Sequence, residues 1–220
     1  MTIKKIVEVN EIHEIVHFTS NHGLVGTLET GLVLSRRKLP EVDHLAYIAS
    51  PTSKSRQEAE QYFDKAEDWL DFVNLSISEI NQHYFGFASS RWHVSGDRWW
   101  TILSFKPEIL EHPGVYFTTT NNIYQHVKRS QGADGLRALF ATRINRKDNW
   151  YALRHGRAPR LPTCQQAEVL YPHALSIEYL QKVYVMSDED HDVVAGWLRY
   201  YGKSDIEVKI APEKFLGVPN

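Results

Sequence analysis

The sequence contains the stretch Cys164-Gln165-Gln166-Ala167-Glu168-Val169-Leu170-Tyr171-Pro172, which places a glutamate inside a segment of β-strand composition. Its aliphatic and aromatic residues favour a strand, and Pro172 ends it. A charge within a strand is costly unless it faces water, has a partner or takes part in chemistry. Glu168 is therefore either a solvent-facing residue or a catalytic carboxylate, and the residues alone leave both interpretations open.

A basic segment, residues 143–160, comes shortly before this strand. Its net charge is +5, whereas the whole chain carries −2, so the remainder carries −7. Lys and Arg side chains contact phosphates, and the rings of Trp150 and Tyr151 offer surfaces on which unpaired bases stack. Charge runs are usually solvated loops, but the position next to Glu168 favours a role in substrate binding.

The stretch His17-Phe18-Thr19-Ser20 stands at the end of a predicted strand and directly before a predicted helix. Polar groups at such a junction can hold an anionic or ribose-bearing ligand. The alternative is structural: Thr19 or Ser20 caps the helix, and His17 is half-buried with its hydrogen bonds satisfied.

Short strands and short helices follow one another without the regular β-α-β-α order of a doubly wound fold. This pattern predicts an α+β fold with a mixed or antiparallel sheet. The predicted strands cover residues 11–18, 44–49, 71–77, 99–105, 115–119, 167–171, 180–185 and 206–210, and the predicted helices cover 21–30, 53–69, 121–128, 133–140 and 187–201.

Length and composition narrow the class of protein further. A chain of 220 residues with 42% hydrophobic residues can bury the core of one domain. Its apolar runs are too short to span a membrane, and Glu8 and Glu11 argue against a secretory signal, so we expect a cytoplasmic protein. The single cysteine, Cys164, excludes an intrachain disulfide and a cysteine-built zinc site.

Several familiar motifs are missing from the sequence. It has neither a G-x-G-x-x-G dinucleotide fingerprint nor a P-loop, which argues against both of these nucleotide sites. The chain has eleven histidines, but none forms H-E-x-x-H or another metal-binding spacing, so we expect no metal.

Taken together, these segments resemble the DarT family of DNA-modifying ADP-ribosyltransferases, the toxins of DarT–DarG toxin–antitoxin pairs. The stretch from His17 to Leu24, continuing to Gly31-Leu32, is similar to the opening H-x-T motif of the family. Residues 166–170 resemble the segment that bears the catalytic glutamate of the family, and 71–74 and 115–118 resemble segments between the two. Two residues depart from the family pattern: Gly23 replaces a frequent Asn, and Asn74 replaces the usual Pro. Both departures suggest the guanine-modifying branch rather than the thymidine-modifying one.

The resemblance implies a single domain over residues 1–220 with a split, ADP-ribosyltransferase-like sheet, mixed or antiparallel, and short flanking helices. Such a domain binds NAD without a Rossmann motif, and a helical element over 53–70 would cover the cofactor. Arg56 would contact the NAD phosphates and assist catalysis, with Arg36 and Arg37 as alternatives. The residues implied to contact NAD are His17, Thr19, Asn21, Leu24 and Arg56.

The resemblance also implies the reaction and the partners. Glu168 would stabilise the positive charge that develops on the ribose and accept a proton from the attacking base. The loop 143–163 would bind single-stranded DNA, and a separate DarG-like macrodomain antitoxin would remove the ADP-ribose. We expect a monomer that does not bind a membrane. The implied DNA contacts are Arg143, Arg146, Lys147, Trp150, Tyr151, Arg154 and Arg157.

Other acceptors and another class of function stay open. Thymidine, RNA or a protein could receive the ADP-ribose, and Gln166, two residues before Glu168, is a feature of protein-modifying relatives. An RNA 2'-phosphotransferase-like enzyme would lack the catalytic glutamate. A non-catalytic nucleic-acid-binding module would use the basic segment and would need neither His17 nor Glu168.

Overall fold

The computed structural model describes residues 1–39, 69–92, 98–124, 127–146 and 150–217. Within them the chain has the α+β fold that the sequence predicts. The predicted strand 44–49 lies outside the described residues, and so does the predicted helix 53–69 except for Trp69, which begins a 3-10 helix (Trp69–Asp71).

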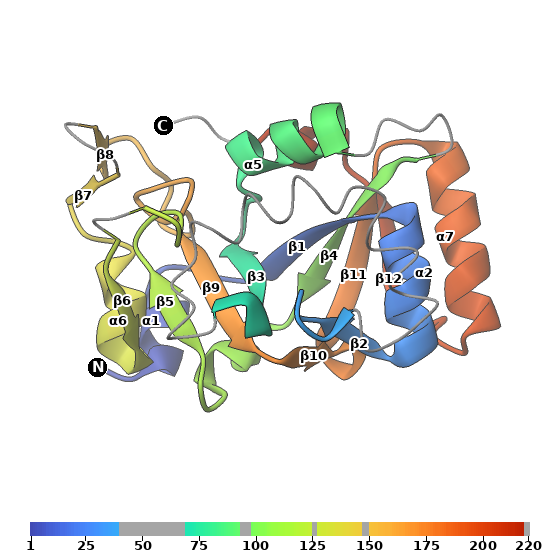
Figure 1. Cartoon of the computed structure of the whole chain (residues 1–220), viewed down its shortest axis with the longest axis horizontal. Helices are drawn as coiled ribbons and strands as arrows, with labels where there is room; N and C mark the ends of the chain where they lie inside the picture. The colour runs from blue at the N-terminus through green and yellow to red at the C-terminus, as the bar shows by residue number, and fades with distance from the viewer. Residues whose placement is uncertain (40–68, 93–97, 125–126, 147–149, 218–220) are drawn as a thin grey trace.

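A mixed sheet of eight strands forms the centre of the described part of the chain (Figure 1). Neighbouring strands are antiparallel except the first two in the sheet, which are parallel. The order across the sheet is β12 (Glu207–Ile210), β11 (Leu180–Val185), β4 (Trp100–Phe105), β1 (Ile15–Ser20), β3 (Phe72–Ile77), β9 (Glu168–Pro172), β5 (Tyr116–Thr118) and β6 (Arg129–Gln131).

The sheet splits between β1 and β3. These two strands pair at Ile15 with Ile77 and at Val16 with Ser76, and they then diverge. From His17 onward β1 continues to pair with β4, whereas the first residues of β3 pair with β9. His17 therefore lies where the two halves of the sheet separate, which is the split that the resemblance implies.

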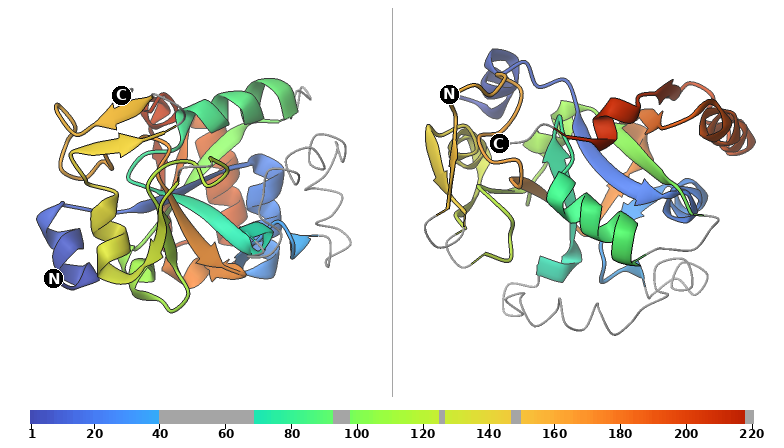
Figure 2. Two further views of the ribbon diagram at one scale, coloured as in Figure 1. Left: turned by 60° about the vertical axis from the view of Figure 1, so that its left-hand side comes forward. Right: turned by 90° about the horizontal axis from the view of Figure 1, so that it is seen from above.

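Helices gather at the two ends of the sheet (Figures 1 and 2). Helix α1 (Ile3–Val9) packs against α6 (Gly132–Ala138) at one end, while α2 (Asn21–Thr30) and α7 (Asp188–Tyr200) lie at the other. Side-chain oxygens of Ser20 and Ser187 cap α2 and α7. Gly31 ends α2 with a φ of 70°, a left-handed conformation that favours glycine.

Alternating side chains of the central strands build a core on each face of the sheet. Leu103 and Phe105 of β4 face the larger core, whereas Trp100 and Ile102 face a smaller one. Helix α5 (Gln82–Phe87), which continues into a π-helix (Ala88–Trp92), covers the smaller core together with a 3-10 helix (Pro212–Phe215). The other 3-10 helices are Pro107–Glu111 and Ile177–Tyr179.

Two small antiparallel ribbons complete the described structure. Strand β2 (Leu32–Leu34) pairs with β10 (Ala174–Ser176). Strand β7 (Arg143–Asn145) pairs with β8 (Tyr151–Leu153), so part of the basic segment is a hairpin rather than an irregular loop. Figure 1 shows this hairpin projecting from the end of the molecule opposite α7.

Two predicted elements differ from the structure. The helix predicted over 121–128 is wrong for the described residues, which form a turn at 122–124 and strand β6 from Arg129. The side chain of Asn121 accepts the N–H of Ile123 at 3.1 Å, a local bond that competes with helix formation. The strand predicted over 11–18 begins only at Ile15, because Glu11 adopts a φ of 53°.

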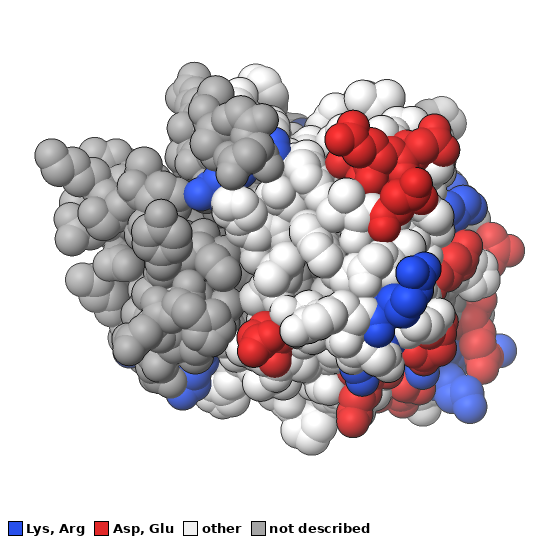
Figure 3. Space-filling view, turned by 90° about the vertical axis from the view of Figure 1, so that its right-hand side faces the viewer, with Lys and Arg blue, Asp and Glu red and all other residues white. Residues whose placement is uncertain are grey.

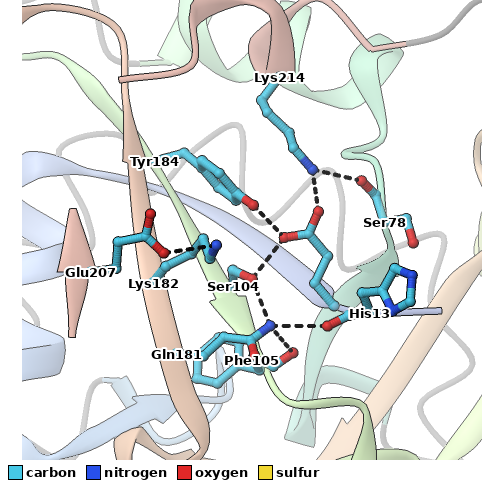
Figure 4. A network of polar contacts seen from close by, with 10 residues as sticks. His13, Ser78, Ser104, Phe105, Gln181, Lys182, Tyr184, Glu207 and Lys214 are labelled. Atoms are coloured by element: carbon cyan, nitrogen blue, oxygen red, sulfur yellow. Dashed lines mark hydrogen bonds and ion pairs between the residues drawn. The ribbon is translucent and has the colours of Figure 1, made fainter. Parts of the chain in front are cut away.

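A half-buried polar network connects the C-terminal 3-10 helix to the sheet through Glu14, and Figure 4 shows Lys214, Tyr184 and Ser104 within it. One carboxylate oxygen of Glu14 pairs with the ammonium of Lys214, and the other accepts from Tyr184 at 2.7 Å and Ser104 at 2.8 Å. Burial alone would raise the pKa of Glu14, but Lys214 and the two hydroxyls outweigh it and hold that pKa below its usual value.

Candidate active site

Glu168 is the first residue of β9, and its side chain is held from two sides. Its Oε1 accepts from the side-chain amide of Asn74 on β3 at 3.3 Å, and its Oε2 accepts from the backbone N–H of Asn122 at 2.8 Å. Because only 8% of Glu168 is exposed, the solvent-facing interpretation is wrong. A buried, oriented carboxylate is what the catalytic interpretation requires.

The environment of Glu168 leaves its carboxyl group partly protonated and partly ionised at neutral pH. Burial raises the pKa of this carboxyl group to about 7, while the Asn122 N–H, the Asn74 amide and the positive charge of Arg129 oppose the rise. Both the protonated and the ionised form are thus populated close to pH 7. A group of this kind can accept a proton from a substrate and release it again.

His17 lies across the split from Glu168, and Asn74 connects the two. The Nδ1 of His17 is 2.9 Å from the backbone carbonyl oxygen of Asn74, whose side chain binds Glu168. Burial lowers the pKa of His17 even though the carbonyl contact opposes this, so the ring is neutral at pH 7. A carbonyl oxygen can only accept, so Nδ1 carries the proton and Nε2 is left as an acceptor.

The other residues of the opening motif are half-buried or buried. Thr19 is half-buried at the end of β1, next to the start of α2. Asn21 begins α2, and its backbone N–H donates to Trp99 at 2.9 Å. Leu24 is fully buried in the larger core, so its side chain serves packing.

Two arginines of the basic segment are occupied by the protein itself. The side chain of Arg157 is 3% exposed and forms an ion pair with Glu79, whose side chain is 6% exposed. Arg154 donates to the carbonyl oxygens of Leu161, Ala158 and Pro159. These contacts hold the chain between the hairpin and β9 in shape.

The hairpin presents a different set of side chains to solvent. Ile144 and Ala152 face inward with Cys164, whereas the residues on either side of them along both strands are exposed. On the outer face the guanidinium of Arg143 lies 3.4 Å from the ring centre of Tyr151. Trp150, the residue before β8, is 72% exposed. An exposed ring beside a cation suits the stacking of an unpaired base next to a phosphate.

Of the remaining predicted residues, some have contacts in the structure and others lie outside the described residues. Arg146 donates from its Nε to the sulfur of Cys164 at 3.3 Å. Arg56 and Lys147 lie outside the described residues. Arg36 and Arg37, the alternatives to Arg56, follow β2, and the backbone N–H of Arg37 donates to Leu70 at 3.1 Å.

Charge is distributed unevenly between the two ends of the molecule. The first turn of α7 carries Asp188, Glu189 and Asp190, and Figure 3 shows acidic side chains gathered on the face that carries this helix. The basic hairpin projects at the opposite end (Figure 1). A polyanion would therefore be attracted toward the hairpin and away from α7.

Three residues at the site are not among those predicted from the sequence. Asn74 stood out only as a departure from the family pattern, and Asn122 and Arg129 carried no signal at all. They reach Glu168 from positions 94, 46 and 39 residues earlier in the chain, so only the folded sheet brings them together.

The described residues contain no cluster of three or more His, Cys, Asp or Glu side chains placed to hold a metal ion. No helix among them is both long enough and apolar enough to cross a bilayer.

The fold is similar to that of several solved DarT structures. Thermus sp. 2.9 DarT in complex with ADP-ribosylated ssDNA aligns with a TM-score of 0.61 at 14% identity, covering 93% of this chain and 96% of that one. The same protein in complex with NAD+ aligns with a TM-score of 0.61 at 16% identity, covering 93% and 98%. Thermosipho africanus DarTG in complex with ADP-ribose aligns with a TM-score of 0.63 at 15% identity, covering 92% of this chain and 51% of that one. These likenesses confirm the predicted fold.

Sequence comparison identifies the family. No curated protein sequence matches the chain. A family model described as "ssDNA thymidine ADP-ribosyltransferase, DarT" matches residues 16–216, a range that includes both His17 and Glu168. The chain therefore belongs to the DarT family of single-stranded-DNA ADP-ribosyltransferases.

Proposed function

We propose that this protein transfers ADP-ribose from NAD to guanine in single-stranded DNA, with Glu168 as its catalytic carboxylate. The observation that carries the proposal is the link through Asn74, which hydrogen-bonds His17 with its backbone and Glu168 with its side chain. This link brings a neutral imidazole and a carboxylate to the two sides of the split in the sheet.

Both side chains suit the ribose next to nicotinamide. The unprotonated Nε2 of His17 can accept from a ribose hydroxyl, and Glu168 can accept from another. NAD, when bound, supplies the ADP-ribosyl group, with nicotinamide as the leaving group. Thr19, Asn21 and Arg56 are proposed as further contacts to NAD.

The chemistry needs Glu168 in its ionised form. The carboxylate stabilises the positive charge that develops on the ribose as the bond to nicotinamide breaks and its electron pair departs with nicotinamide. The base nitrogen then bonds to the same carbon, and Glu168 takes the proton that this nitrogen loses. A pKa of about 7 suits a group that accepts a proton in one turnover and returns it to water before the next.

The outer face of the β7–β8 hairpin is the proposed DNA-binding surface. Arg143 would contact a phosphate, and Tyr151 and Trp150 would stack on bases. Arg146 and Lys147 are proposed as additional phosphate contacts. The buried ion pair of Arg157 and the three carbonyl contacts of Arg154 favour structural roles for these two residues.

Guanine is proposed over thymidine because Gly23 and Asn74 depart from the family pattern, and Asn74 lies directly against Glu168. The family description names thymidine, so the acceptor base is the part of the proposal that an experiment must decide.

The test uses purified protein, NAD and short single-stranded oligonucleotides that differ only in whether they contain guanine or thymine, read by intact-mass spectrometry. A gain of one ADP-ribose on the guanine oligonucleotides alone supports the proposal. A gain that requires thymine contradicts the choice of base and keeps the reaction. Transfer only to RNA or to protein contradicts the DNA acceptor.

A toxin role in the cytoplasm is proposed together with the reaction. The fold is shared with Thermosipho africanus DarTG, and the proposed partner is a DarG-like macrodomain that removes ADP-ribose from DNA. Growth arrest of cells that express the chain, relieved by a co-expressed macrodomain, would support this role. Unimpaired growth with modified DNA in the cell would contradict it.

A further inference from the structure

Arg129, the first residue of β6, grips Asn122 at two points. Its Nε donates to the side-chain oxygen of Asn122 at 2.5 Å, and its Nη2 donates to the backbone oxygen of the same residue at 2.6 Å. A planar guanidinium that binds two oxygens of one residue fixes that residue in both position and orientation.

Asn122 passes this constraint to Glu168. It is 2% exposed, and its backbone N–H is the donor that lies 2.8 Å from Glu168 Oε2. The turn that holds Asn122 has internal bonds from the N–H of Ile123 and the N–H of Tyr124 to Asn121. The turn lies in the connection between β5 and β6, whose ladder ends at Thr118 and Arg129, and the N–H of Thr119 donates to the Lys128 carbonyl at 3.1 Å just beyond it. Within this connection the guanidinium of Arg129 is the group that binds both oxygens of Asn122.

Arg129 is itself held in place from the opposite side. Its guanidinium carbon lies 5.2 Å from the ring centre of Trp69, whose side chain is buried. The rings of Phe72 and Tyr116 pack against Trp69, which connects this stack to strands β3 and β5. The cation is therefore oriented by the sheet that also carries Glu168.

We propose that Arg129 is a positioning residue for the transfer reaction. Its two hydrogen bonds to Asn122 orient the backbone N–H of Asn122 toward Glu168, and this N–H in turn fixes the direction of the carboxylate. The inference rests on the proposed catalytic role of Glu168. Arg129 acts through Asn122, and no direct hydrogen bond joins it to Glu168 among the described contacts.

Other titratable groups around Glu168 have separate partners. His17 on β1 is neutral and bonded to the Asn74 carbonyl. Asp71, the last residue of the 3-10 helix before β3, is bound to His173 just beyond the far end of β9. On the segment before β9, Cys164 lies between Thr120 and Arg146. Arg129 is the one described cation that lowers the pKa of Glu168, so its removal has a specific electrostatic consequence.

The test compares Arg129→Gln and Arg129→Lys with Arg137→Gln in the full chain. Arg137 lies on the next element, α6, in an exposed pair with Asp134, and serves as the matched control. The measurement is kcat for nicotinamide release across a pH series, with saturating NAD and single-stranded DNA, and with melting temperatures to verify folding.

The expected result for Arg129→Gln is a loss of kcat of about 10- to 100-fold near pH 7, because the carboxylate loses its fixed direction. The midpoint of the acidic limb should also move to higher pH by about one unit, because a nearby positive charge is lost. Arg129→Lys keeps the charge without the two-point grip, so it should keep the midpoint and still lose kcat. Arg137→Gln should match the wild type.

A second variant covers the case in which Arg129→Gln folds poorly. Asn122→Ala removes one of the two oxygens that Arg129 grips but keeps the N–H donor, and should lower kcat less than Arg129→Gln. A wild-type kcat in both Arg129→Lys and Asn122→Ala, with both variants folded, would overturn the inference. Full activity in Glu168→Gln would instead overturn the proposed function, so the two failures are distinguishable.

Discussion

The buried pair of Arg157 and Glu79 yields a prediction that separates the structural arginines of the basic segment from those that face DNA. Both side chains are nearly inaccessible, at 3% and 6% exposed, and Arg157 also donates to the Pro162 carbonyl at 3.1 Å. Replacing Arg157 with Met removes the cation and leaves the Glu79 carboxylate buried without it.

The magnitude follows from that burial. Breaking a buried ion pair on one side costs about 3–5 kcal/mol, which for a chain of this size lowers Tm by about 6–20 °C. Arg143→Met should cost only about 0.5–1 kcal/mol, because Arg143 is exposed and stacked on Tyr151. Replacing both Arg157 and Glu79 with apolar residues should restore most of the lost stability.

Two assays test this prediction, one of stability and one of DNA binding. Thermal melting gives the stability of each variant, and fluorescence anisotropy with labelled single-stranded DNA at several salt concentrations gives the salt dependence of binding. Arg143→Met should reduce the slope of log K against log salt by about 0.7, the value for one phosphate contact, and Arg157→Met should leave that slope unchanged. A reduced slope with an unchanged Tm in Arg157→Met would refute the structural role.

Three further predictions concern the carboxylates and the opening motif. Because the pKa of Glu168 is raised to about 7, the folded state binds an extra proton between roughly pH 4.5 and pH 7 and loses stability as pH rises through that window. The Tm of Glu168→Gln should therefore rise relative to that of the wild type from about pH 5 to pH 8. A difference in Tm that stays constant over this range would contradict the prediction. The pKa of Glu14 is lowered, so the stability that its carboxylate contributes is present above its ordinary pKa and is lost at lower pH. Lys214→Met should therefore lower the free energy of unfolding by about 2–3 kcal/mol at pH 7 and by much less near pH 3, as measured by thermal melting. An equal loss at both pH values would argue against the ion pair. A Cβ added at Gly23 would lie 2.1 Å from Thr19 Oγ1, so Gly23→Ala should displace Thr19 and raise the KM for NAD, whereas an unchanged KM would exclude Thr19 from the NAD site.

Elements with strong local signals could be predicted from the sequence. Helices α2 and α7 begin at serine caps, and α2 ends at Gly31. Strands β3, β4 and β11 are rich in β-branched and aromatic residues, which favour strands. The burial of side chains alternates along much of β3, and every residue of β4 is buried. The same local reasoning was wrong at 121–128, where the Asn121 side chain stabilises a turn that propensity does not reveal.

The site could be predicted only in part, and for a physical reason. Glu168 and His17 stand in recognisable local stretches, so the sequence points to both. Their connection through Asn74 and the clamp from Arg129 join strands that meet only in the folded sheet. The burial of Arg157 depends on Glu79, which lies 78 residues earlier in the chain. Composition alone therefore cannot distinguish a buried arginine such as Arg157 from an exposed one such as Arg143.

The most direct test of the account compares the wild type with Glu168→Gln in one reaction containing NAD and a guanine-containing single-stranded oligonucleotide. We predict that the wild type produces an oligonucleotide heavier by one ADP-ribose, that the variant leaves the oligonucleotide mass unchanged, and that the Tm of the variant is not below that of the wild type. Transfer by a folded Glu168→Gln protein would contradict the central claim that this buried carboxylate carries the chemistry.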